Sequence, residues 1–157
     1  MTKFATFIFD IDGTLADGYF RTHFLTTEPK NWEAYFNYLE HDRKIEPVVT
    51  VLKSLRERGY GIIFCTARPD TYREQTAKWL FTHGLADDNQ LNEPILYMRK
   101  GNDRRSDDIV KSEMLDAIRE LGKYEIVGVF DDRSRVVKMW QRRGLFVFDV
   151  SQGKGDF

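Results

Sequence analysis

The sequence has few of the features that mark a secreted or membrane-bound protein. Its single cysteine, Cys65, cannot form an internal disulfide, which suits a reducing compartment. Cys65 lies in an apolar run, so a buried packing role is favoured over that of a reactive thiol. No stretch approaches the roughly 20 apolar residues that span a bilayer, and Asp10 interrupts the apolar N-terminal stretch too early for a signal peptide. We therefore expect a cytoplasmic protein that does not associate with membranes.

The chain also lacks an excess of charge of either sign. It carries 24 basic and 25 acidic residues, a formal net charge of −1, so it has no global attraction for nucleic acid or membrane surfaces. Any polyanion must therefore be bound by a local basic patch. Two kinds of site are missing as well: the three histidines lack metal-ligand spacing, and no Gly-x4-Gly-Lys-Ser/Thr phosphate-binding loop is present.

What the chain does have is a regular alternation of apolar and amphipathic segments. Its 157 residues suffice for one domain with its own core, expected to extend over 1–157. Strands are expected at 4–9, 60–65, 94–98, 126–130 and 145–150. Helices are expected at 31–41, from 46 to Gly59, at about 70–83, from 106 or 107 to Gly122, and at 134–143. This order favours an α/β fold, a doubly wound, Rossmann-like parallel sheet with helices on both faces.

One segment, residues 16–45, departs from this alternation. It is a long insertion after the first strand, rich in aromatic residues, and we expect it to form a small cap over the site. Trp32, Tyr35, Phe36 and Leu39 lie at helical spacing, which favours packing onto the body of the protein. The alternative is that these aromatic rings, with Tyr38, stack on a nucleobase.

Polar side chains follow three of the expected strands at the point where each strand ends. Asp10 and Asp12 follow the first strand, Thr66 the second, and Asp131 and Asp132 a later one. Ligands of open parallel sheets bind beyond the carboxyl ends of the strands, so these groups should converge. Carboxylates that close together need a cation, and hard oxygen ligands suit Mg²⁺ better than Zn²⁺. The alternative, that each aspartate only caps a turn or helix, explains one strand end better than three.

Basic residues accompany these carboxylates. Lys111 lies in the first turn of an expected helix, and Arg68 follows Thr66 by two residues. A second group crowds the loop before Asp107, namely Arg99, Lys100, Arg104 and Arg105. Cations beside a Mg²⁺ site suit a phosphate group. For Lys100, Arg104 and Arg105, a role as solvated surface residues is equally open.

Together these residues resemble the four motifs of the haloacid dehalogenase superfamily of phosphotransferases. The motifs occur in the family's order, as Asp10-Ile11-Asp12-Gly13-Thr14, Thr66, Lys111 and Asp131-Asp132. The segments 99–111 and 130–140 and the chain end at 155–157 are similar to the 3′-phosphatase domain of bacteriophage polynucleotide kinase–phosphatases. The resemblance covers most of the chain and is weakest over 24–45. Because no phosphate-binding loop is present, the 5′-kinase activity of those enzymes is not expected.

The resemblance implies a two-step hydrolysis. Asp10 would attack phosphorus and form an aspartyl-phosphate. Asp12 would protonate the leaving oxygen and then deprotonate the attacking water. Neighbouring carboxylates would raise the pKa of Asp12, whereas Mg²⁺ and Lys111 would lower it, so the sequence leaves the direction of that shift open.

The remaining roles also follow from the resemblance. Asp131 would bind Mg²⁺ with the Asp10 carboxylate and the Asp12 backbone carbonyl, and Asp132 would bind it through water or orient other groups. Thr66 and Lys111 would hold the phosphoryl oxygens.

Four further residues match groups used at the phage enzyme's active site, and they would bind substrate: Arg21, Arg68, Arg99 and Asp107. For Asp107 a role as a helix N-cap is equally open.

These patterns favour a Mg²⁺-dependent phosphomonoesterase that acts on nucleic-acid 3′ ends, an end-healing reaction of nucleic-acid repair, or on nucleotides. One alternative is a phosphatase of small molecules such as nucleoside monophosphates or sugar phosphates. A more distant one is a phosphorylatable receiver module, also doubly wound with an acidic pocket. Receivers carry adjacent acids after the first strand, whereas here the adjacent pair, Asp131-Asp132, comes late.

Overall fold

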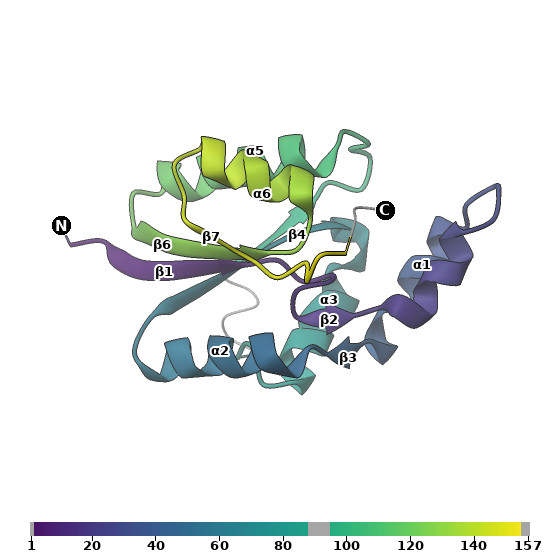
Figure 1. The fold of residues 1–157 in the computed structure, drawn as a ribbon, viewed down its shortest axis with the longest axis horizontal. Coiled ribbons are helices and arrows are strands. Elements are labelled where there is room, and N and C mark those ends of the chain that lie inside the picture. The colour runs from purple at the N-terminus through teal and green to yellow at the C-terminus, as the bar shows by residue number, and fades with distance from the viewer. Residues whose placement is uncertain (1, 88–94, 155–157) are drawn as a thin grey trace.

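A five-stranded, all-parallel sheet forms the centre of the molecule in a computed structural model, which describes residues 2–87 and 95–154. The strand order is β5-β4-β1-β6-β7 (Figure 1). The strands are β1 (Phe4–Phe9), β4 (Gly61–Pro69), β5 (Leu96–Arg99), β6 (Tyr124–Asp131) and β7 (Val147–Asp149). All five expected strands are therefore present. Of the third expected strand, 94–98, residue 94 lies outside the described part of the chain, as do residues 155–157.

Helices cover both faces of this sheet. Figure 1 shows α2 (Glu46–Glu57) and α3 (Arg73–Thr82) below it, and α5 (Asp107–Glu120) and α6 (Ser134–Arg142) above it. Because side chains of a strand alternate between faces, Phe7 and Phe9 pack with the α2 and α3 core, and Ile8 packs with the α5 and α6 core. The predicted doubly wound α/β fold is confirmed.

The order of the strands places the end of β1 in a special position. The chain runs from β1 outward through β4 to β5, then returns to the other side of β1 for β6 and β7. Connections on the two sides of β1 therefore diverge, and ligands of such sheets bind beyond the carboxyl ends of the strands at this point. Asp10 and Asp131 lie at those ends of β1 and β6.

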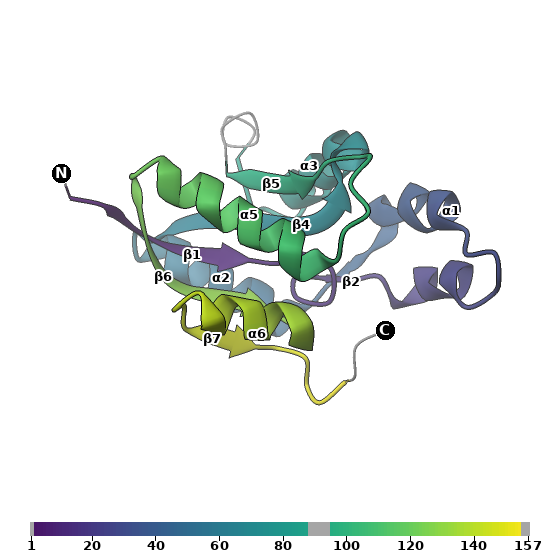
Figure 2. The same cartoon turned by 90° about the horizontal axis from the view of Figure 1, so that it is seen from above.

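The insertion leaves and rejoins the body through a short two-stranded stem. Strand β2 (Ala16–Asp17) pairs antiparallel with β3 (Arg43–Lys44). Between them lie the 3₁₀ helix η1 (Tyr19–Leu25), the helix α1 (Trp32–Asn37) and the 3₁₀ turn η2 (Leu39–His41). Figures 1 and 2 both show α1 projecting beyond the carboxyl end of β1. The insertion thus forms a small cap on the side of the sheet where the strand-end aspartates lie.

The cap differs from its prediction in how its apolar residues are used. The expected helix at 31–41 is divided into α1 and η2, and of its four expected inward residues only Leu39 is fully buried. Trp32 is 50% exposed. The physical reason is that a cap with one two-turn helix has no second layer to enclose a core of its own. Elsewhere Cys65 is buried, as expected, and burial raises the pKa of its thiol to about 12.

Among the residues that the structure describes, no helix is both long enough and apolar enough to cross a membrane.

Candidate active site

Asp10 is held by a buried lysine at the end of β1. The Lys111 Nζ donates to Asp10 Oδ1 at 2.8 Å and to Asp131 Oδ2 at 2.9 Å. Lys111 is only 2% exposed and projects from the first turns of α5. Burial alone would lower the pKa of Lys111, but Asp10 and Asp131 outweigh it and raise that pKa above its usual value. The lysine therefore stays charged between two carboxylates from two neighbouring strands.

A third carboxylate completes an acidic group at this edge. Carboxylate oxygens of Asp10, Asp131 and Asp132 lie within 4.8 Å of one another. The hydroxyl of Thr14 donates to Asp10 Oδ2 at 2.9 Å, which fixes the carboxylate opposite Lys111. The turn that permits this approach needs Gly13, which has a φ of +81° and whose added Cβ would lie 2.0 Å from Asp132 Oδ2.

The acidic group fits a divalent cation. Burial, followed by the charge of Asp131, raises the pKa of Asp10 well above its ordinary value, although Lys111 acts in the opposite direction. Burial likewise raises the pKa of Asp132. A bound cation would reverse these shifts, and three hard oxygen donors without sulfur or imidazole suit Mg²⁺. The carboxylate of Asp12 is not in this group, so its expected contribution to a metal remains its backbone carbonyl.

Asp12 has an entirely different environment, although it lies only two residues from Asp10. Arg68 donates from Nε to Asp12 Oδ2 at 2.9 Å and from Nη2 to Oδ1 at 2.7 Å, a bidentate pair. Arg21 Nη2 adds a contact at 3.2 Å. Burial would raise the pKa of Asp12, but Arg68 first and Arg21 next outweigh it, so that the pKa lies below its usual value. The direction that the sequence left open is thus downward in this structure.

A second carboxylate, Asp42, holds the two arginines in place. Arg21 Nε and Nη2 both donate to Asp42 at 2.7 Å, and Arg68 Nη2 donates to it at 3.2 Å. Trp79 Nε1 donates to the Asp42 carbonyl at 2.9 Å, which anchors this part of the cap stem to α3. The side chains of Asp42 and both arginines are fully buried. Sequence reasoning missed Asp42, and the only signal for it was indirect, since two buried guanidinium groups require a buried acid.

The predicted substrate arginines Arg21 and Arg68 are therefore brought to the site, where they act on Asp12. Asp12 itself is 33% exposed at its side chain, so it is the member of this group that a ligand reaches. Thr66 is buried within β4, which continues past the expected end to Pro69, and its hydroxyl accepts a hydrogen bond from the Arg68 amide at 3.2 Å. In the described residues Thr66 is thus bonded to Arg68 and not to the carboxylate group.

The other predicted pair, Arg99 and Asp107, forms a neighbouring cluster. Asp107 accepts from Arg99 through one oxygen and from Arg133 through the other. The N-cap residue of α5 is Ser106, so the alternative role of Asp107 as the N-cap is wrong. Arg99 is fixed further by donating to the Ala67 carbonyl at 2.9 Å.

Of the three basic loop residues with open roles, Arg105 is bound in a surface ion-pair network with Asp103 and Glu113. Lys100 and Arg104 are exposed.

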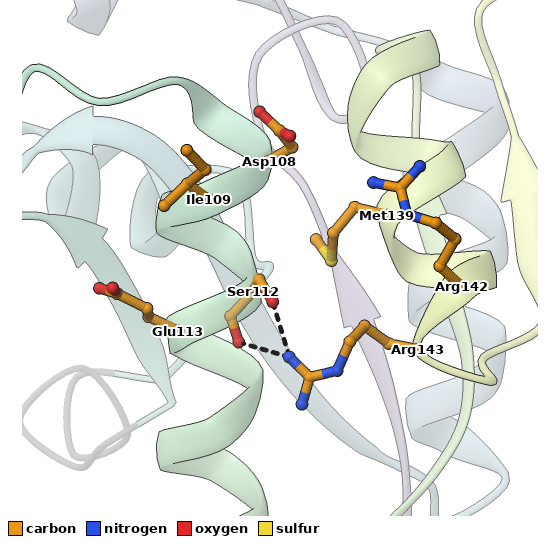
Figure 3. Close-up of a pocket in the computed structure, with 7 residues that line it drawn as sticks. All are labelled: Asp108, Ile109, Ser112, Glu113, Met139, Arg142 and Arg143. Carbon is orange, nitrogen blue, oxygen red and sulfur yellow. Dashed lines mark hydrogen bonds between the residues drawn. The ribbon is translucent and has the colours of Figure 1, made fainter.

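A separate pocket of about 310 Å³ lies between α5 and α6 (Figure 3). Arg143 reaches across it and donates to Ser112 Oγ at 2.6 Å. None of the catalytic candidates lines it; the lining residues are Asp108, Ile109, Ser112, Glu113, Met139, Arg142 and Arg143. The pocket is therefore distinct from the carboxylate site at the strand ends.

Comparison with known proteins gives a consistent set of relatives. The sequence matches, over residues 5–157, the family model described as the polynucleotide kinase PNKP phosphatase domain. A protein assigned as a bifunctional polynucleotide kinase/RNA ligase in Autographa californica nuclear polyhedrosis virus is 29% identical over 133 residues, covering 84% of this chain and 17% of that protein. A chain of the Pnkp1/Rnl/Hen1 RNA repair complex superposes with a TM-score of 0.75 at 34% identity, covering 98% of this chain and 43% of that chain.

The class C acid phosphatase of Bacillus anthracis shares the fold alone. It superposes with a TM-score of 0.70 at 15% identity, covering 99% of this chain and 70% of that chain. This chain spans less than half the length of the viral protein and of the RNA repair protein that it matches. The predicted family and the prediction of an enzyme are both confirmed: the chain belongs to the phosphatase domains of polynucleotide kinase PNKP and is a phosphatase of the haloacid dehalogenase type.

Proposed function

We propose that this phosphatase is a Mg²⁺-dependent phosphomonoesterase that removes 3′-phosphates from polynucleotide ends through an aspartyl-phosphate on Asp10. The observation that carries the proposal is the placement of Asp10. It directly follows β1, charge-paired with Lys111 and within 4.8 Å of the carboxylate oxygens of Asp131 and Asp132. A nucleophile, a fixed cation and a metal-ligand set thus meet at one strand end.

The carboxylates of Asp10, Asp131 and Asp132, with the backbone carbonyl of Asp12, would hold the metal. When bound, Mg²⁺ supplies positive charge that keeps Asp10 ionised and neutralises the phosphoryl oxygens. Lys111 supplies a second, permanent positive charge beside Asp10. Thr66 and Lys111 are the proposed ligands of the phosphoryl oxygens, and Arg99 and Asp107 bind farther along the substrate.

In the first step an oxygen of Asp10 bonds to phosphorus while the bond between phosphorus and the ester oxygen breaks. Asp12 gives its proton to that leaving oxygen. In the second step Asp12 takes a proton from water, the water oxygen bonds to phosphorus, and the bond to Asp10 breaks, which releases phosphate and restores both aspartates. Arg68 and Arg21 favour the ionised, base form of Asp12, and an anionic substrate beside Asp12 opposes them and favours the acid form.

The choice of a polynucleotide end rests on the family and on two relatives. The viral relative is assigned as a polynucleotide kinase/RNA ligase, and the solved relative is a component of an RNA repair complex. We therefore assign this site to repair of nucleic-acid ends. The sequence has no phosphate-binding loop, so the proposal attributes no 5′-kinase activity to these residues.

A substrate panel with Mg²⁺ tests the proposal. It compares a 3′-phosphorylated oligonucleotide, a 3′-mononucleotide, a 5′-mononucleotide, a sugar phosphate and p-nitrophenyl phosphate. We expect the highest kcat/KM on the oligonucleotide and no turnover with excess chelator. A preference for the 5′-mononucleotide or sugar phosphate would establish a small-molecule phosphatase instead, and full activity in chelator would refute the role of the metal.

A further inference from the structure

The cap presents a connected set of aromatic rings, here called the aromatic wall: Trp32, Tyr35, Phe36 and Tyr72. The ring of Trp32 stacks at 6.0 Å, between centroids, on Phe36, which stacks in turn at 4.9 Å on Tyr72 of the body. The edge of Tyr35 meets Trp32 at 5.8 Å. Phe36 and Tyr72 thereby join α1 to the 3₁₀ turn η3 (Asp70–Tyr72) that follows β4.

Within this wall the members differ in what covers them. Tyr35, Phe36 and Tyr72 are half-buried, as packing residues of a small cap should be. Trp32 is 50% exposed, while the other two tryptophans, Trp79 and Trp140, are 2% and 0% exposed. Packing onto the body therefore accounts for Phe36 and not for Trp32, whose ring is held in place by two neighbours and keeps an open surface.

The wall is continuous with the proposed reaction centre. The guanidinium carbon of Arg21 lies 4.3 Å from the centre of the Tyr35 ring, and Arg21 Nη1 donates to the Tyr35 carbonyl at 3.1 Å. Arg21 Nη2 in turn lies 3.2 Å from Asp12. Three successive contacts, through Arg21 and Tyr35, thus link Asp12 to Trp32.

A positive charge accompanies the open ring. Lys30 Nζ lies 5.9 Å from the centre of the Trp32 ring, within reach of a cation–π contact. An aromatic face beside a cation is the combination that binds single-stranded nucleic acid, because the ring stacks on a base and the cation meets the backbone phosphate. A small phosphate ester in contact with Asp12 would not extend to this surface.

We propose that Trp32 stacks on a base of the substrate strand, within the first few nucleotides of its 3′ end, and that Lys30 binds the adjoining phosphate. This inference rests on the proposed function and makes the site one for single-stranded ends. Because every base has an aromatic face, the contact is tolerant of sequence. In a blunt duplex the base faces are already covered by their neighbours, so such an end gains little from Trp32.

The kinetic test compares Trp32→Ala, Trp32→Phe and Phe146→Ala. Phe146 is 68% exposed and precedes β7, toward the amino ends of the strands and away from the cap, so it is a matched exposed aromatic control. We measure kcat/KM on a ten-nucleotide single strand with a 3′-phosphate, on the 3′-mononucleotide and on p-nitrophenyl phosphate. Trp32→Ala should lower the ratio of the first to the last about tenfold, mainly through KM. Trp32→Phe should restore most of this loss, and Phe146→Ala should leave the ratio unchanged.

A binding test separates this inference from the proposed function. Since Trp79 and Trp140 are buried, quenching of tryptophan emission by an unphosphorylated ten-nucleotide single strand reports on Trp32. Quenching that disappears in Trp32→Phe supports the stacking site even if the enzyme fails to hydrolyse 3′-phosphates. Absence of quenching in the wild type, or an equal loss of activity on all three substrates in Trp32→Ala, overturns the stacking site even if 3′-phosphatase activity is found.

Discussion

Two halves of the site, the sheet side and the cap side, treat neighbouring aspartates in opposite ways. On the sheet side, Asp10 is buried among carboxylates with a single lysine, and its pKa is raised. On the cap side, Asp12 is bound by Arg68 and Arg21, and its pKa is lowered. The two aspartates are only two residues apart in the chain, yet their pKa values shift in opposite directions, because their partners come from different parts of the fold.

The difference indicates what each half needs from a ligand. Among the residues that the structure describes, the sheet side has an excess of negative charge, since Lys111 supplies one positive charge beside three carboxylates, and a divalent cation would offset this excess. The cap side contains two arginines and two aspartates, Asp12 and Asp42, so its charges balance within the chain. The first half therefore has the charge and the oxygen ligands that suit a divalent cation, and the second holds one side chain in a fixed position.

The largest expected effect comes from breaking the sheet side at its proposed nucleophile. Asp10→Asn removes the carboxylate that we propose attacks phosphorus and should lower kcat by more than about 1,000-fold, with the melting temperature little changed. Turnover of p-nitrophenyl phosphate and a thermal melt measure the two quantities. The control is Asp149→Asn. Asp149 lies in β7 beside Asp131 of β6, at the same end of the sheet, but it is exposed. Near-wild-type activity in Asp10→Asn would show that another group attacks phosphorus.

Breaking the cap side should affect stability as well as activity. Asp42→Asn removes one of the two carboxylates that pair with the buried guanidinium groups of Arg21 and Arg68, leaving that of Asp12, and the loss of one partner from a buried ion pair costs about 3–5 kcal/mol. Because Asp12 then loses its fixed position, kcat/KM should fall by about 10- to 100-fold. Urea denaturation and steady-state kinetics measure these changes.

The matched control for Asp42→Asn is Glu113→Gln. It removes one partner of Arg105 in the surface network, where exposed pairs contribute little, so neither stability nor activity should change appreciably. If the two substitutions proved equally harmless, Asp12 and the packing of the cap would suffice to hold the arginine pair, and Asp42 would have no positioning role.

The charge excess on the sheet side predicts a response to metal. Saturating Mg²⁺ should stabilise the wild type by about 2–3 kcal/mol, or roughly 5–10 °C in Tm. Asp132→Asn removes one of the repelling carboxylates, so in chelator it should melt above the wild type and gain less from Mg²⁺. Thermal melts with and without Mg²⁺ test both statements. A larger gain in the variant than in the wild type would place the metal away from Asp132.

The sheet side was the more predictable half. Asp10, Asp131 and Lys111 follow strands or begin a helix whose apolar pattern is local, and a general rule of parallel sheets brings such ends together. The cap side depends on how the insertion folds back. Asp42 meets Arg21 and Arg68 across 21 and 26 residues of sequence, and no local pattern specifies that pairing.

The cap helix was mispredicted for a related reason. Helical spacing identifies a possible apolar face, but burial needs a partner layer, which α1 lacks at Trp32. The direction of the Asp12 pKa shift was likewise beyond the sequence, because it depends on contacts that the insertion makes only after it folds back onto the body.

The smallest expected effect, and the sharpest test of the comparison, is a difference in how the two halves respond to pH. A carboxyl whose folded pKa is lowered contributes stability above its unfolded pKa of about 4, and this is lost as pH falls through the folded value. That is the case of Asp12, so the advantage of the wild type over Asp12→Asn should shrink below about pH 4. A carboxyl whose pKa is raised in the folded state lowers the stability of the protein as pH rises from about 4 through that raised pKa. Asp132 is such a carboxyl. In chelator, the stability of Asp132→Asn relative to the wild type should therefore increase as pH rises from 4 to 7, as measured by denaturation midpoints. Parallel pH profiles for the two variants would mean that Asp12 and Asp132 share one electrostatic environment.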